Sequence, residues 1–161
     1  MNYRASLVAS LLAVAGCSGG GSSGTGGDPP PQAPPPVPPT SCTGNNLINV
    51  IAATDNGLSG AGNGPDMAID DNLDPASVWE SPGDPGTITF DLGVRYLVRE
   101  VGIAWFEGDQ RVASFSVLAS EDGVSFEPLL ANQQSSGETQ SFERYDTPDT
   151  PARYVLSLIH I

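Results

Sequence analysis

The chain has 161 residues and a strongly unbalanced charge, with 19 acidic residues against 6 basic ones and a formal net charge of −13. It contains no lysine, and all of its arginines except Arg4 lie in the second half of the sequence. Such a surface repels nucleic acid and anionic lipid, because both are bound through a basic face. Nucleic-acid binding is therefore set aside, and a salty exterior suits the chain because cations screen its self-repulsion.

Residues 1–16 read as a secretory signal, with a charge at Arg4, an apolar run over 5–15 and small residues before Cys17. The run is too short to span a bilayer permanently. The ending LAVAGC resembles a bacterial lipobox, in which Cys17 is acylated and becomes the first residue of the mature protein. An ordinary signal peptide with an incidental cysteine is the alternative. Several acyl chains anchor a protein stably, and Ser18 follows the cysteine, so we expect a lipid anchor in the outer membrane of a Gram-negative bacterium.

Residues 17–45 join this signal to the rest of the chain and are rich in Gly and Ser, then in Pro. They cannot bury a core, so we interpret them as a linker, flexible at first and then stiffer polyproline II. If Cys17 is acylated, Cys42 has no partner in an oxidising compartment, where free thiols are unusual. This is a first indication that the sequence is incomplete.

Residues 46–155 suffice for one domain with a single core. Short segments rich in β-branched and aromatic residues predict strands at 47–53, 87–92, 98–106, 115–119, 125–130, 140–145 and 153–158. In the fourth segment Phe115, Val117 and Ala119 share one face. Residues 120–123 then read as a hairpin turn whose Gly123 supplies a positive φ. With one helical turn at 66–69, the pattern predicts a β-sandwich or jelly roll.

Residues 70–77, with the sequence DDNLDPAS, form an acidic loop with many side-chain oxygens. Calcium takes six to eight oxygen ligands at about 2.3–2.6 Å, and a loop supplies these well. The Gly and the bidentate Glu of an EF-hand are absent from the spacing. Composition alone favours the alternative, a solvated loop whose side chains cap its turns.

Four phrases follow one another along the chain: AIDDNLDPASVW at 68–79, TITFDLG at 87–93, FSVLASEDG at 115–123 and ARYV at 152–155. In this order they resemble the discoidin-like (coagulation factor 5/8 type C) domain, and within it the family 32-type carbohydrate-binding modules. The resemblance implies an all-β, discoidin-like jelly-roll β-sandwich that binds sugars or lipid headgroups and catalyses nothing. It also implies a structural calcium, held by side chains of Asp70 and Ser77 and by carbonyls of Met67, Asn72 and Ser77. Asp71 replaces the family's usual Gly.

Two tryptophans have different expected roles. Trp79 stands where the family has a buried Trp, whereas for Trp105 core packing and stacking on a sugar ring are both open. The stretch WFEGDQR at 105–111 resembles the FYxGDxR stretch of discoidin-like modules attached to alginate lyases, and it suits hydrogen bonding to hydroxyls or a carboxylate. A surface hairpin with a weak ion pair is the alternative. The ligand-binding candidates are Trp105, Glu107, Asp109 and Arg111, with Glu80 from a neighbouring loop.

No catalytic motif accompanies these candidates. The single histidine is His160, and neither G-x-S-x-G nor HExxH occurs, so the chain is expected to be non-catalytic. Residues 156–161, LSLIHI, resemble a translated sequencing-adapter read-through. We therefore expect a non-native tail after Val155, and a fold that lacks its last strand together with a calcium-binding Glu.

The leading hypothesis is a cell-surface lipoprotein whose module holds a polysaccharide, with alginate or another uronate polymer as the named candidate. The negative charge of the domain is an objection to a polyanionic ligand. Binding then requires a local arginine patch (Arg111 with Arg95 or Arg144) or bridging cations, unless the glycan is neutral. One alternative is the N-terminal fragment of a longer polysaccharide lyase or glycoside hydrolase. Another is an adhesion module that binds a protein partner.

Overall fold

The computed structural model of the protein describes residues 5–9, 47–57 and 59–160. This part of the chain is built almost entirely of strands, with one short 3₁₀ helix. The elements are β1 (Ala5–Ala9), β2 (Ala52–Asp55), η1 (Pro65–Ala68), β3 (Trp79–Ser81), β4 (Gly86–Trp105), β5 (Ser114–Ser120), β6 (Glu127–Gln134) and β7 (Glu143–His160). None of the described helices is long and apolar enough to cross a membrane.

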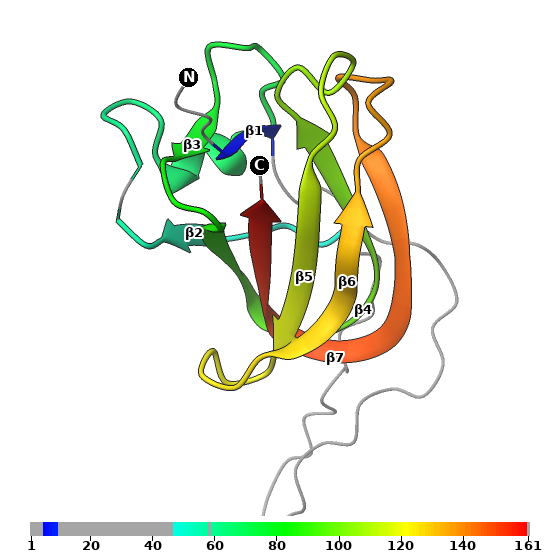
Figure 1. Cartoon of the computed structure of the whole chain (residues 1–161). Helices are drawn as coiled ribbons and strands as arrows, with labels where there is room; N and C mark the ends of the chain where they lie inside the picture. The colour runs from blue at the N-terminus through cyan, green and yellow to red at the C-terminus, as the bar shows by residue number, and fades with distance from the viewer. Residues whose placement is uncertain (1–4, 10–46, 58, 161) are drawn as a thin grey trace, which may run out of the picture.

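All strand pairs are antiparallel, in the order β3-β1-β4-β7-β5-β6, with β2 beside β4. The long strands β4 and β7 pair over two stretches, from Gly86↔Ile159 to Asp91↔Tyr154 and from Tyr96↔Ala152 to Ile103↔Glu143. The register shifts between these stretches, and both strands bend there, so the sheet folds over into two layers (Figure 1). The expected all-β jelly-roll sandwich is confirmed.

The core lies between the layers and is filled by every second residue of the strands. In β5 the buried positions are Phe115, Val117 and Ala119, as the sequence predicts. The centroids of Trp105 and Phe115 are 4.8 Å apart, and those of Phe115 and Tyr145 are 4.9 Å apart. Each fully buried large side chain stabilises the fold by about 1.5–3 kcal/mol.

Strand positions differ from the prediction mainly at their ends. The segments expected at 87–92 and 98–106 form one strand, β4, and those at 140–145 and 153–158 form another, β7. Gly93 and the prolines of β7 suggest breaks in the sequence, but the sheet accommodates them where it bends. The expected strand at 47–53 is shifted to β2, and that at 125–130 to β6. The helical turn at 66–69 is confirmed as η1.

Two elements involve residues that the sequence analysis places outside the domain. Strand β1 lies within the predicted signal peptide and runs between β3 and β4, with Ser6 opposite Glu80 and Leu7 opposite Trp105. Residues 156–160, assigned to a non-native tail, continue β7 between β4 and β5, and Ile159 is buried among them. Signal cleavage and read-through both stay predictions. Cys17, Cys42 and the linker at 17–45 lie outside the described residues.

Candidate functional site

The acidic loop (residues 70–77) is shaped by its own side chains. Asp70 Oδ1 accepts a hydrogen bond from the Asn72 amide at 3.0 Å, Asn72 Oδ1 from the Asp74 amide at 3.0 Å, and Asp74 Oδ1 from the Ala76 amide at 2.9 Å. These are successive Asx turns, in which a side chain takes the place of a backbone carbonyl. These turns therefore define the path of the loop, whose residues 70–76 are exposed.

Three of the four residues predicted to hold calcium come together at the base of this loop. The hydroxyl of the buried Ser77 donates to Asp70 Oδ2 and lies 3.3 Å from the sulfur of Met67, which η1 positions. Asn72, whose backbone carbonyl is the predicted ligand, uses its side-chain oxygen to accept from the Asp74 amide. The Asp70 carboxylate and the Ser77 hydroxyl are two oxygen donors of the kind that a hard cation such as calcium prefers. In the described part of the chain no three His, Cys, Asp or Glu side chains cluster, so neutral oxygens would supply most ligands.

The second component is a tight turn at residues 105–111, which follows β4. The Trp105 carbonyl accepts from the Gly108 amide at 3.0 Å, and the Glu107 carbonyl accepts from the amides of Gln110 and Arg111 at 2.8 and 2.9 Å. Glu107 adopts φ +53°. A Cβ on Gly108 would lie 2.4 Å from the Thr139 carbonyl oxygen, so glycine allows the turn to pack against the segment before β7.

The charged side chains of this 105–111 turn are engaged in contacts within the turn or with Gln140. Arg111 Nε lies 3.1 Å from Glu107 Oε2, and its guanidinium lies 5.1 Å from the centroid of the Phe106 ring. Asp109 Oδ1 accepts from Gln140 Nε2 at 2.8 Å. The ion pair of the alternative interpretation is present, but the turn is not a hairpin, because β7 lies between β4 and β5 in the sheet. Such exposed pairs contribute only about 0–1 kcal/mol to stability.

A cavity of about 210 Å3 separates the acidic loop from the 105–111 turn. We call it the loop cavity. Its apolar wall includes Leu73 and Pro75, and its polar groups come from Glu107, Gln110 and Gln140. An apolar wall facing a few converging polar groups is the usual composition of a small-ligand site.

The predicted ligand-binding residues divide between the cavity and its surroundings. Glu107 lines the loop cavity, whereas Asp109 and Arg111 belong to the same turn but are not among its lining residues. Glu80 lies on β3, where its Oε2 accepts from Asn63 Nδ2 at 3.1 Å, and it does not line the cavity either.

Trp105 lines the loop cavity but is only 2 % exposed. Its indole donates to the Tyr145 hydroxyl at 3.2 Å and packs on Phe115. Burial raises the pKa of that tyrosine, so its hydroxyl stays protonated and donates in turn to Glu143 at 2.8 Å. Of the two roles weighed for Trp105, the structure therefore supports core packing and not stacking on a sugar.

Sequence reasoning missed several lining residues. Leu73 and Pro75 are the apolar residues of the acidic loop, whose many oxygens predict a metal site and not an apolar wall. Gln140 follows the turn by about thirty residues and is held by Asp109. No local pattern links it to the turn, because the contact depends on how β7 begins.

The arginines show a simple electrostatic arrangement. Every arginine in the part of the chain that the structure describes has a carboxylate partner within salt-bridge distance. The pairs are Arg95–Glu121, Arg99–Asp149, Arg111–Glu107, Arg144–Glu100 and Arg153–Asp91. A patch of arginines free to meet a polyanion is therefore not preformed among these residues.

Comparisons with known proteins agree with this architecture. The family described as F5/8 type C domain matches residues 50–156. A structure of truncated AlyQ with CBM32 and alginate lyase domains is 34% identical with a TM-score of 0.63, and the match covers 70% of this chain but 28% of that one. The CBM32 of AlyQ in complex with 4,5-unsaturated mannuronic acid gives the same identity and TM-score, with 84% of that chain covered. A family 89 glycoside hydrolase from Clostridium perfringens is 27% identical (TM-score 0.54), covering 67% of this chain and 12% of that chain. No curated protein matched the sequence.

Proposed function

Because the chain belongs to the F5/8 type C domain family, we propose that it is a non-catalytic carbohydrate-binding module that holds a polysaccharide in the loop cavity. The observation that carries this proposal is the composition of that cavity, where Leu73 and Pro75 face the polar groups of Glu107, Gln110 and Gln140. Amide side chains both donate to and accept from sugar hydroxyls. The C–H face of a sugar ring packs on the apolar wall.

The size of the loop cavity points to weak binding of a short stretch of glycan. Its volume of about 210 Å3 lies below the ~300–1,000 Å3 of drug-sized sites. A single sugar residue at the cavity, with neighbours in solvent, gives low affinity per module. High local concentration on a surface or a tethered chain then supplies the avidity.

The ligand that we propose first is a uronate polymer of the alginate type. The support comes from the AlyQ module, whose structure holds 4,5-unsaturated mannuronic acid and which is 34% identical. The objection is electrostatic, because Glu107 lines the cavity and already pairs with Arg111. A uronate carboxylate would compete with Glu107 for that guanidinium, or would bind through a bridging divalent cation.

The test is a calorimetric titration of alginate oligosaccharides into the protein. Gln140→Ala removes one hydrogen-bonding group, so we expect a loss of about fivefold in affinity, the equivalent of one net hydrogen bond. Glu107→Gln removes the competing carboxylate and is expected to strengthen uronate binding. Gln134→Ala, an exposed amide on β6 outside the cavity, is the matched control. Binding that is unchanged in Gln140→Ala and Glu107→Gln would place the ligand elsewhere.

We further propose that the acidic loop holds a structural calcium through Asp70 and Ser77, with carbonyls of Met67 and Asn72. The contact between Asp70 and Ser77 supports it, because it places two oxygen donors together, one of them on the buried Ser77. When bound, the ion would cross-link η1 to the acidic loop. Calcium at a concentration of a hundred times its dissociation constant raises the free energy of unfolding by about 2.7 kcal/mol. Thermal unfolding with calcium and with chelator should therefore differ, and Asp70→Asn should abolish the difference while Asp74→Asn keeps it. Equal melting temperatures with and without chelator would refute the site.

A second candidate function is that of a targeting module of a larger polysaccharide lyase. The AlyQ structure favours it, because that chain joins a related module to an alginate lyase domain and this chain spans 28% of it. Reading the gene downstream of Ile161 tests this function, since a catalytic domain in frame supports it and a stop codon contradicts it.

Under either function we propose that the chain is exported, acylated at Cys17 and anchored in the outer membrane. Fatty-acid labelling that is lost in Cys17→Ala tests the anchor.

A further inference from the structure

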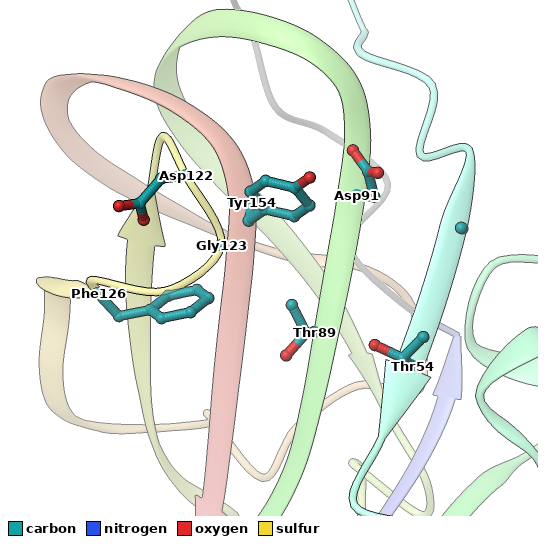
Figure 2. A pocket seen from close by; sticks show the side chains of 8 residues that line it. Thr54, Thr89, Asp91, Asp122, Gly123, Phe126 and Tyr154 are labelled. Atoms are coloured by element: carbon teal, nitrogen blue, oxygen red, sulfur yellow. The ribbon is translucent and has the colours of Figure 1, made fainter.

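A second and larger cavity, of about 390 Å3, lies on the outer face of the sheet. We call it the sheet cavity. The β5–β6 hairpin turn that walls it lies at the end of the sandwich opposite the loops that follow β4 (Figure 1). Its main groups are Thr54, Thr89, Asp91, Asp122, Phe126 and Tyr154 (Figure 2).

Strand register brings these residues together. Thr54 of β2 pairs with Thr89 of β4, and Asp91 of β4 pairs with Tyr154 of β7. In β4 the residue between the two outward positions, Phe90, is buried, so Thr89 and Asp91 face away from the core. The floor of the sheet cavity is therefore made of regular strand positions, which are more precisely placed than loop residues.

The wall of the sheet cavity is also preformed. Asp122 Oδ1 accepts hydrogen bonds from the Ser120 hydroxyl at 3.0 Å and from the amides of Val124 and Ser125 at 2.8 and 2.9 Å. A Cβ on Gly123 would lie 3.1 Å from the Tyr154 ring, so the turn rests directly on that ring. A ligand would meet a site that is already ordered, which reduces the entropy lost on binding.

The chemistry of the sheet cavity favours an uncharged, hydroxyl-rich ligand. Phe126 and Tyr154 border one side, and the hydroxyls of Thr54 and Thr89 lie across from them (Figure 2). Hydrogen bonds from the Ser125 and Val124 amides lower the pKa of Asp122, and those from Arg153 lower the pKa of Asp91. Asp122 is thus anionic at neutral pH and repels a uronate, whereas Asp91 is paired with Arg153.

The arginine that lies beside Tyr154 is already neutralised. Arg153 binds Asp91 through two hydrogen bonds of 3.0 Å, and its guanidinium lies 4.9 Å from the centroid of the Tyr154 ring. None of the described arginines is among the residues that line this cavity. A ligand of the sheet cavity is therefore expected to be neutral, unlike the uronate proposed for the loop cavity.

We propose that the sheet cavity is a second carbohydrate-binding site, which takes a neutral pyranose on Phe126 with its hydroxyls bonded to Thr54 and Thr89. Its volume lies within the ~300–1,000 Å3 typical of small-molecule sites. This inference goes beyond the proposed function, because it concerns other residues, another ligand charge and the opposite end of the sandwich. A module with sites at both ends bridges two glycan chains.

The experiment is an amide NMR titration of the whole chain with three separate probes, which are D-galactose, D-glucose and the charged D-galacturonate. A neutral sugar should shift the amide resonances of Gly123 and Thr89, and galacturonate should shift them less. Thr89→Val removes a hydroxyl at nearly constant shape and should weaken binding about fivefold, the equivalent of one net hydrogen bond. Thr87→Val is its matched control, since it lies on the same strand and face but does not line the sheet cavity.

Phe126→Ala tests the aromatic contact and should weaken binding by about tenfold. The control is Val124→Ala, because Val124 belongs to the same turn and is 83% exposed. If Phe126→Ala does not fold, Thr89→Val still decides. The proposal is overturned if neither neutral sugar shifts Gly123, if Thr89→Val binds like Thr87→Val, or if galacturonate binds more tightly. Gln140→Ala in the loop cavity should leave the Gly123 shifts unchanged, so the two sites succeed or fail separately.

Discussion

The hydrogen bond between Trp79 and Asp55 ties two edges of the sandwich together, and its removal should be measurable. The indole of Trp79 is fully buried, and its Nε1 donates to Asp55 Oδ2 at 2.7 Å, while Asp55 Oδ1 accepts from the Gly57 amide at 2.8 Å. Asp55→Ala leaves the buried indole N–H without its partner. Such a group destabilises a protein by about 1–3 kcal/mol. Asp55→Asn keeps an acceptor and loses only the charge, so its effect should be smaller.

The effect should also depend on pH. Burial raises the pKa of Asp55, but hydrogen bonds from Trp79 and Gly57 outweigh it and hold the pKa below its ordinary value of 3.8. A carboxyl whose folded pKa is depressed stabilises the fold fully above its unfolded pKa, and the stabilisation is lost as pH falls through the folded pKa. The difference between wild type and Asp55→Asn should therefore be largest near neutral pH and shrink in acid.

Thermal unfolding at about pH 7 and about pH 3 checks both statements. One kcal/mol shifts the melting temperature of a small domain by about 4–8 °C, so Asp55→Ala should melt roughly 10 °C lower at neutral pH. Glu138→Gln, which changes an exposed carboxylate, is the control. An Asp55→Ala protein as stable as wild type would refute the reasoning. So would an Asp55→Asn difference that is equal at the two pH values.

Two further substitutions test the sheet. Gly123→Ala places a side chain at φ +75° and 3.1 Å from the Tyr154 ring, and urea unfolding should show a loss of about 1–2 kcal/mol. Gly60→Ala, where no atom lies within 4 Å of the added carbon, should change little, and equal losses would contradict the argument. Ile159→Ala, at a 1% exposed position of β7, should lower the free energy of unfolding by about 2–5 kcal/mol. A loss as small as that of the exposed Val124→Ala would mean that β7 ends before Ile159.

The sequence predicts best what depends on near neighbours. The alternation of Phe115, Val117 and Ala119 follows from the two-residue period of a strand, and it is confirmed. The turn at Gly123 follows from the local Asp-Gly pair, and its positive φ is confirmed. In the acidic loop, Asp70 and Ser77, which the resemblance names as calcium ligands, lie in contact, and the calcium itself stays a prediction.

Features that depend on distant segments could not be read from the sequence. The joining of two expected strands into β4 depends on β7 pairing with it across the bend, so Gly93 looks like a break until its partner is known. The bond from Trp79 to Asp55 spans 24 residues. The loop cavity depends on Gln140 reaching the 105–111 turn, and short-range patterns say nothing about such contacts.

Strand β1 has a consequence for the order of events in the life of the chain. β1 (Ala5–Ala9) pairs with β3 on one side and with β4 on the other, yet its residues belong to the predicted signal peptide. If the chain is cleaved before Cys17, the exported protein loses this strand, and the backbone groups of β3 and β4 that pair with it are left without hydrogen-bond partners. Precursor and mature chain would then differ in architecture as well as in length. Export would come before completion of the sandwich, and the mature protein would need another strand to close it.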